Sequence, residues 1–365
     1  MAASTARGGH EAPLYPSYYP QEIRIEAVAP SSAARLLEEG GIQAYLGAEP
    51  EFAGPVPDSL RYVESLGSFL VVRVNASSPR AQPEDAMCGL VRSLLTTLSA
   101  DPRGFVLHPY PITAVHADYL HHADLAAAAR ARLLEGPAAP LDGLRVRAEG
   151  AEAERLVRGL WPGEEAEWDV SLEVVDAAGL VAAERFAING WLGPPWLKEG
   201  WFHASLLLAP ALDDPGSRER VERLVARLQT DAPADETERL NLERELLGLL
   251  TASCRAIVAG YSVKREYYSD AYSEGIENIA HDSHAGLNAP IFLRTVKLKD
   301  FPWNGWLRLG VPEPPQAAWN PFAGFGDEAG RLIWSAIGDP ALFPEPYSDG
   351  WILNRIGEVQ EGNER

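Results

Sequence analysis

The sequence has few cysteines and no long hydrophobic run. Its 365 residues include two cysteines, Cys88 and Cys254, too few for a disulfide-rich scaffold or a zinc knuckle. Each lies in a stretch with helical apolar spacing, so we expect two small buried side chains rather than a disulfide or a metal pair. No run of ~18 apolar residues is present, and no apolar segment follows residues 1–9. These absences predict a cytoplasmic protein without a signal peptide or a membrane span.

Positive charge is scarce as well. The chain has 32 Lys and Arg against 52 Asp and Glu, which gives a net charge of −20. A surface this negative repels phosphate backbones and anionic lipid, so nucleic acid and membranes are not expected partners. Only four of the basic residues are lysines, which together with abundant alanine is typical of a GC-rich bacterial coding sequence. The composition indicates an acidic bacterial protein.

What is present is the pattern of an ordinary folded chain, with 46% hydrophobic and 23% charged residues. Short strands alternate with amphipathic helices, which predicts an α+β (mixed α/β) fold. The expected strands are 22–28, 69–74, 105–107, 144–148, 168–174 (one arm of a hairpin that turns at 176–179), 202–208 and 291–298. The expected helices are 33–39, one from Pro83, one ending at Leu134, 152–160, one around 221–228, 236–259 and 327–337.

The domain organisation is read from shifts in composition. Residues 1–20 are rich in Gly, Pro, Ser and Tyr and predict a flexible arm. An α+β domain is expected over 21–190, followed by a helical and β region over 191–365 that either stands alone or continues the first domain. The later region contains a long irregular segment rich in aromatic residues and proline. Such segments are usually functional in compact proteins, so we expect function there.

The first candidate site lies at 116–124, where three histidines and two aspartates occur within nine residues. Imidazole and carboxylate are the ligands of Zn and Fe sites, and Asp118 and His122 stand four residues apart on one helical face. This spacing predicts a metal or catalytic role for His116, Asp118, His121 and His122. The alternative is a polar helix start that serves only for capping.

The second candidate site is formed by Glu277, His281 and His284. In a helix their spacing places them on one stripe, but the outer two would be ~10 Å apart, so a helix could bring at most two of them to one ion. A loop could bring more, and an ordinary polar surface segment is the alternative. Joined with the first cluster, these residues would supply the histidines and carboxylate of a non-haem iron or zinc site.

Basic residues of the same region form a third candidate. Lys264, Arg265 and Arg294 could hold an anionic group of a substrate, and the alternative is an edge strand protected by lysines. The glycine-rich stretch 324–330 is not read as a dinucleotide turn, because Asp327 and Glu328 would place negative charge where phosphate should bind. No P-loop, nucleophile elbow or EF-hand loop is present.

The leading hypothesis from the sequence is a soluble enzyme that acts on a small molecule through an Fe or Zn centre. Its metal ligands would be His116, His121, His122, His281 and His284, its catalytic groups Glu277, Asp118 and Tyr267, and its substrate-binding groups Lys264, Arg265 and Arg294. One alternative is a non-catalytic accessory or assembly protein that wraps a partner subunit with its Tyr-, Trp- and Pro-rich ends. Another is a metal-free binding protein for an aromatic or anionic ligand.

Overall fold

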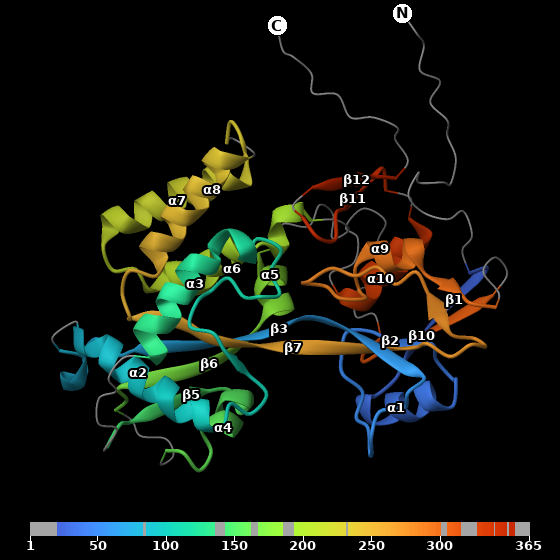
Figure 1. Ribbon diagram of the computed structural model, residues 1–365, viewed down its shortest axis with the longest axis horizontal. Coiled ribbons are helices and arrows are strands. Elements are labelled where there is room, and N and C mark those ends of the chain that lie inside the picture. Colours follow the sequence, from blue (N-terminus) through green and yellow to red (C-terminus); the bar gives the residue numbers. More distant parts are fainter. Residues whose placement is uncertain are drawn as a thin grey trace, which may run out of the picture. The chain divides into compact units, whose positions relative to one another are not determined.

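The computed structural model describes residues 20–82, 85–135, 143–161, 167–184, 193–230, 233–300, 305–314, 327–338, 340–348 and 350–354. They form helices and a mixed sheet, which confirms the predicted α+β fold (Figure 1). The chain forms two compact units. Unit 1 comprises the described residues within 1–65, 185–195 and 264–365, and unit 2 those within 66–184 and 196–263. The predicted arm and the predicted boundary near residue 190 lie outside the described residues.

Strands β3 (Leu60–Val74) and β7 (Ala256–Ser269) contribute residues to both units. In unit 2 the strand order is β7-β3-β6-β5, with β4 also paired to β7. The other strands of this unit are β4 (Val106–Leu107), β5 (Val146–Glu149) and β6 (Val170–Asp176). Its helices are α2 (Asp85–Ala100), α3 (Tyr119–Leu134), α4 (Ala151–Val157), α5 (Ala177–Ala183), α6 (Gly200–Leu208), α7 (Pro215–Gln229) and α8 (Glu236–Leu250). Three short 3-10 turns are also present, at Pro79–Ala81, Pro195–Lys198 and Ala209–Ala211.

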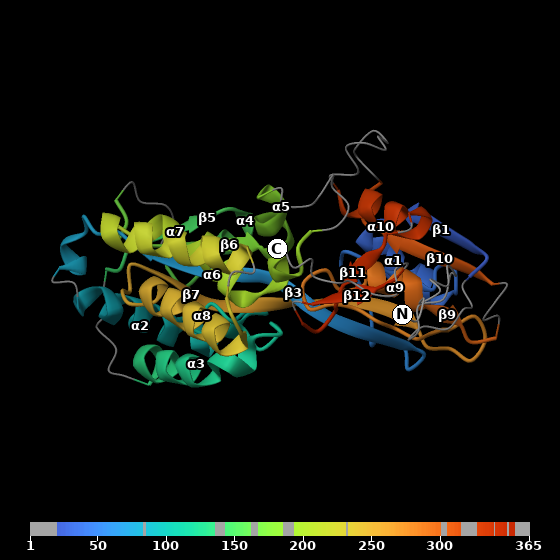
Figure 2. The same ribbon diagram turned by 90° about the horizontal axis from the view of Figure 1, so that it is seen from above.

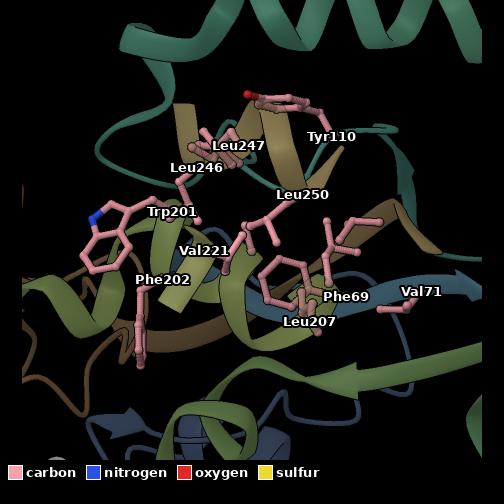
Figure 3. Close-up of a cluster of buried hydrophobic side chains, with 14 of the residues drawn as sticks. Phe69, Val71, Tyr110, Trp201, Phe202, Leu207, Val221, Leu246, Leu247 and Leu250 are labelled. Atoms are coloured by element: carbon pink, nitrogen blue, oxygen red, sulfur yellow. The ribbon is translucent and has the colours of Figure 1, made fainter. Parts of the chain in front are cut away.

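Both faces of the unit 2 sheet are covered, because successive side chains of a strand point to opposite faces. On β3, Phe69 and Val71 pack in one core with α6, α7 and α8, whereas Leu70 and Val72 pack in a second core with α2 and α4. Figure 3 shows the first core, where Trp201 and Phe202 lie near Val221. Helices α7 and α8 run side by side in both views (Figures 1 and 2). This two-sided burial explains the continuous apolar run at the centre of β3.

A disulfide joins Cys88 of α2 to Cys254, 166 residues later and just before β7. The prediction of two separate buried thiols was wrong. Each cysteine does lie in the second core of unit 2, as its apolar spacing indicated. The sequence spacing could not show that the two Cα atoms come within 5.1 Å of each other.

In unit 1 the strand order is β1-β10-β2-β7, which continues in the same eight-stranded sheet. Strands β1 (Glu22–Ala27), β10 (Trp306–Val311) and β2 (Ala44–Tyr45) are parallel, and β7 pairs antiparallel to β2. Helix α1 (Pro30–Glu38) covers one face, and α9 (Pro290–Thr295) and α10 (Glu328–Ile337) cover the other. Two small antiparallel pairs complete the unit, β8 (Ile276–Glu277) with β9 (Lys297–Leu298) and β11 (Leu342–Pro344) with β12 (Trp351–Leu353).

Several predicted elements differ from the structure. The segment predicted as strand 202–208 is helix α6, in which every residue except Leu206 is buried, so no polar face was present to reveal its helical period. The predicted hairpin turn after β6 is helix α5, which Asp176 caps by accepting a hydrogen bond from the Gly179 N–H. Helix α8 ends at Leu250, nine residues before the predicted end. The predicted strand 291–298 is mostly helix α9, with Pro290 in its first turn.

None of the helices in the described ranges is long and apolar enough to cross a membrane.

We predict that Asp169 makes a large contribution to stability that depends on pH. Its side chain is fully buried and accepts hydrogen bonds from Arg145 Nη2 (2.9 Å) and Ser78 Oγ (2.5 Å). Burial acts to raise the pKa of Asp169, but these hydrogen bonds outweigh it and lower the pKa to about 2. A folded-state pKa below the unfolded value stabilises the fold above pH ~4, and this contribution of about 2–3 kcal/mol is lost as the pH falls toward 2.

The Asp169→Asn variant should therefore lose about 2–3 kcal/mol of unfolding free energy at pH 7, nearly as much at pH 5 and about half as much at pH 3. Urea unfolding of wild type and variant at the three pH values measures this difference. The exposed Asp58 offers the control, since Asp58→Asn should change stability by less than about 0.5 kcal/mol. A difference between wild type and Asp169→Asn that stays constant from pH 7 to pH 3 would contradict the prediction.

Candidate functional site

Unit 1 contains a cavity of about 220 Å³ at the ends of its parallel strands, here called the strand-end cavity. Its walls come from the residues that follow β2, from those that end and follow β10, from Asn288, and from the start of α10. The lining residues are Leu46, Gly47, Asn288, Val311, Pro312, Glu313, Pro314, Asp327 and Ala329. Most of the wall is apolar, with a few polar groups among the apolar side chains. This is the usual composition of a small-molecule site.

The topology of unit 1 places this cavity at the carboxyl ends of two neighbouring parallel strands. Strand β1 is followed by α1 on one face of the sheet, and the neighbouring strand β10 is followed by α10 on the other face. Open α/β sheets bind ligands outside the carboxyl ends of their strands. The strand-end cavity lies at the carboxyl ends of β2 and β10.

A buried carboxylate ties two of the cavity walls together. Glu266 of β7 is fully buried; its Oε1 accepts a hydrogen bond from the Gly47 N–H (2.5 Å), and its Oε2 accepts one from the Leu287 N–H (2.7 Å). A β-carbon at position 286 would lie 1.8 Å from Oε2, and Gly286 has a φ of +62°, so both space and backbone conformation require glycine there. Glu266 thus holds the segments that carry Gly47 and Asn288.

Unit 2 contains a second group of interest, here called the Asp118 cluster and made of Asp118, His122, Glu199 and Glu243. Donor atoms of Asp118, His122 and Glu243 all lie within 4.8 Å of one another, and all three side chains are buried. Asp118 precedes α3, His122 lies in its first turn, and Glu243 comes from α8. The Asp118 carboxylate accepts hydrogen bonds from the Gly200 and Trp201 N–H groups, so it caps α6 rather than its own helix.

The Asp118 cluster gathers negative charge in the interior. Glu243 Oε1 accepts a hydrogen bond from Arg239 Nε (3.0 Å), and Glu243 Oε2 lies 3.2 Å from His122 Nε2. Burial raises the pKa of Asp118, and the charge of Glu243 raises it further. Burial likewise raises the pKa of Glu199, and the nearby Asp118 adds to this shift. Carboxylates that share a dry interior in this way favour protonation or a bound cation.

His116 is occupied in a separate hydrogen-bonded chain. The Thr113 N–H lies 2.9 Å from His116 Nδ1, His116 Nε2 lies 2.9 Å from His203 Nδ1, and His203 Nε2 lies 2.9 Å from the Leu197 carbonyl oxygen. The bonds to backbone groups assign the tautomers, since each ring must be neutral with its hydrogen on Nε2. Burial and the neighbouring His203 lower the pKa of His116, which agrees with a neutral ring. Both nitrogens of His116 are thus in use.

The remaining residues predicted to bind metal or to act in catalysis are not part of the Asp118 cluster. His121 is exposed on α3. Glu277 is exposed in β8, opposite Lys297 of β9. His281 and His284 lie in a loop of unit 1 rather than in a helix, and burial lowers the pKa of His281. The two histidine clusters therefore belong to different units, and their metal roles stay predictions.

The predicted substrate-binding residues have structural contacts. Arg265 Nε lies 3.0 Å from Glu64 Oε1, and its guanidinium lies over the ring of Tyr62. Arg294 donates to the Gly338 carbonyl oxygen, and its guanidinium lies over the ring of Phe343. Lys264 is half-buried on β7. The Tyr267 ring is buried against Phe52 and Tyr62, and burial raises its pKa.

Sequence reasoning missed Glu199, Glu243 and the walls of the strand-end cavity. A signal for Glu243 was present, because it stands on the apolar stripe of α8, three and four residues before Leu246 and Leu247, and a charge on such a stripe is buried. The cavity wall after β10 was missed because β10 itself was read as coil rich in tryptophan and proline.

Comparisons with known proteins give only distant similarities. No family model matches the sequence, and no curated protein does. Among solved structures, HbpA2 from Haemophilus parasuis is 11% identical with a TM-score of 0.42, covering 74% of this chain and 57% of that one. The periplasmic binding protein DppA from Helicobacter pylori, in complex with a peptide, is 9% identical with a TM-score of 0.39, covering 73% and 56%. A nickel ABC transporter structure from Bacillus halodurans is 11% identical with a TM-score of 0.40, covering 68% and 57%.

These comparisons contradict the function and the location predicted from the sequence. DppA is described as a periplasmic binding protein associated with an ABC transporter, and the Bacillus halodurans structure as a nickel ABC transporter, so the hypotheses of a soluble metal enzyme and of an assembly protein are corrected. The prediction of a cytoplasmic location was wrong for the same reason. The Cys88–Cys254 disulfide agrees with this correction, because disulfides are rare in the cytosol. The chain spans 56–57% of the length of these three structures, and the low TM-scores transfer no ligand to it.

Proposed function

We propose that this protein binds a small-molecule solute outside the cytoplasm without transforming it, and that the strand-end cavity is its binding site. The observation that carries the proposal is the position of this cavity at the carboxyl ends of β2 and β10, beside the start of α10. Ligands of open α/β sheets bind at such strand ends. The disulfide of unit 2 supports the location, since it requires an oxidising compartment.

The lining indicates the chemistry of the ligand. Leu46, Val311 and Ala329 offer an apolar wall, and Glu313 supplies a carboxylate at the exposed rim. The Asp327 carboxylate also lines the cavity, where it accepts a hydrogen bond from the Gly330 N–H. A volume of about 220 Å³ is below the ~300–1,000 Å³ of drug-sized sites. The expected ligand is therefore small, with an apolar body and a cationic amine that faces Glu313.

Thermal unfolding in the presence of candidate ligands tests this proposal. The panel contains primary amines of amino-acid size, each paired with a neutral alcohol and a carboxylate of the same shape. At a concentration of 100 Kd a true ligand stabilises the folded state by about 2.7 kcal/mol, so an amine of suitable size should raise the melting temperature by several degrees. The paired alcohol should raise it less, and the carboxylate should have no effect.

Two variants locate the site. Ala329→Leu should abolish the shift, because its larger side chain fills the cavity from α10. Glu313→Gln should weaken amine binding about two- to fivefold and leave alcohol binding unchanged, which corresponds to the loss of one exposed charge contact. The exposed Glu277 provides the control variant Glu277→Gln, which should bind like wild type. A panel that gives no shift, or shifts that persist in Ala329→Leu, would refute the assignment of the cavity.

A further inference from the structure

The Asp118 cluster has the geometry of a metal site. The donors are one imidazole nitrogen and one oxygen from each of two carboxylates, a set that suits zinc and neighbouring transition metals. Donor atoms around tetrahedral zinc stand about 2.0–2.1 Å from the ion, so they lie about 3.4 Å apart. The donors of Asp118, His122 and Glu243 already lie within 4.8 Å of one another, and small side-chain rotations would bring them onto one ion.

An independent observation points to a missing cation. The Glu199 side chain is only 4% exposed, and its Oε1 has no hydrogen-bond partner among the described residues. The same holds for Nδ1 of the fully buried His122. Burying a hydrogen-bond acceptor without a partner costs folding free energy, and the cost is larger for a carboxylate than for a neutral group. An ion bound through either atom would satisfy that atom.

Hydrogen bonds hold two carboxylates of the Asp118 cluster in place, as is usual for metal ligands. The Gly200 and Trp201 N–H groups orient the Asp118 carboxylate, and Arg239 orients that of Glu243. Metal-binding carboxylates are commonly held by such hydrogen bonds. Arg239 pairs with Glu243 and the charge of the buried Lys198 acts on Glu199, while Asp118, Glu199 and Glu243 together carry up to three negative charges. A divalent ion would compensate the excess.

We propose that Asp118, His122 and Glu243 bind one divalent metal ion in the interior of unit 2, with the neighbouring Glu199 as a fourth donor. The ion would be structural, because the cluster is buried and its ligands join α3, α8 and the start of α6. Its binding energy would then contribute to the folding of unit 2. The proposal does not depend on the strand-end cavity, which belongs to unit 1, so either assignment can fail alone.

Metal analysis after refolding tests the proposal with zinc as the probe. The disulfide-bonded protein is unfolded in urea with EDTA, desalted, refolded with or without zinc chloride, and freed of loose metal by gel filtration. We expect one zinc per chain in wild type and a melting temperature that rises with zinc. The variants His122→Asn and Glu243→Gln should retain less than a tenth of that zinc, and Glu199→Gln should bind about 10- to 100-fold more weakly.

Two exposed neighbours serve as matched controls, since His121→Asn on α3 and Glu245→Gln on α8 should bind zinc like wild type. Wild type that retains no more zinc than Glu243→Gln overturns the proposal, and so does zinc binding that persists in both cluster variants. If the cluster variants do not refold, anomalous diffraction from wild-type crystals grown with zinc decides. A peak among the three donor atoms supports the site, and its absence there refutes it.

Discussion

Reduction of the Cys88–Cys254 disulfide should lower the unfolding free energy by up to about 5 kcal/mol. The bond closes a loop of 166 residues, and the chain-entropy model gives a stabilisation of about 5 kcal/mol for a loop of this length. Measured losses for native disulfides are about 2–5 kcal/mol. The loop contains α2 to α8, so the unfolded chain gains freedom over nearly all of unit 2.

The measurement is thermal and urea unfolding with and without a thiol reductant, on protein purified from an oxidising compartment. The double variant Cys88→Ala/Cys254→Ala provides the control, because it should start at the reduced stability and show no further response to reductant. Thiol titration of the unfolded, unreduced wild type should find no free thiol. Two free thiols per chain would show that the bond does not form, and would remove the support that it gives to an extracytoplasmic location.

Replacing Glu266 by alanine should cost about 2–6 kcal/mol and abolish ligand binding at the strand-end cavity. The variant leaves the Gly47 and Leu287 N–H groups without their buried acceptor, and each such loss costs about 1–3 kcal/mol. It also releases the two cavity walls from each other. Urea unfolding and the melting shift with an active ligand measure the two effects separately.

Glu266→Gln separates charge from hydrogen bonding, because it keeps one acceptor oxygen and the side-chain volume. Its stability should fall between those of wild type and Glu266→Ala. Lys264→Ala, at a half-buried position on the same strand, should retain stability and ligand binding within error. If Glu266→Ala were as stable as wild type and bound the ligand equally well, the carboxylate would not hold the cavity together.

The correction of the functional hypothesis changes where function is expected. The sequence predicted function in the segment after Tyr261 because of its histidines. In the structure, this segment contributes Glu266 and the backbone from Gly286 to Asn288 to the proposed binding site. A metal site is still proposed at the histidine-rich start of α3, but its other residues are Glu243 of α8 and Glu199 at the start of α6. Local sequence spacing could not predict either of them, because both are far from α3 in the sequence.

Local sequence patterns were enough to predict the elements that have one exposed and one buried face. Strand β1 and helices α1, α2, α3, α7 and α10 were predicted close to their observed positions, because their apolar residues recur at the period of the element. The sequence also determined the α+β class. Where an element is buried on all sides, as in α6, this period disappears, and the prediction of a strand at 202–208 was wrong.

The disulfide, the two units and both candidate sites depend on contacts between residues far apart in the sequence. Cys88 meets Cys254, Asp118 meets Glu243, and Gly47 meets Glu266 across separations of 166, 125 and 219 residues. Contacts at such separations depend on how helices and strands pack, and local periodicity carries no record of them. The sequence does contain few cysteines, but the prediction of two separate buried thiols was wrong, since two cysteines suffice for a disulfide once the fold brings them together.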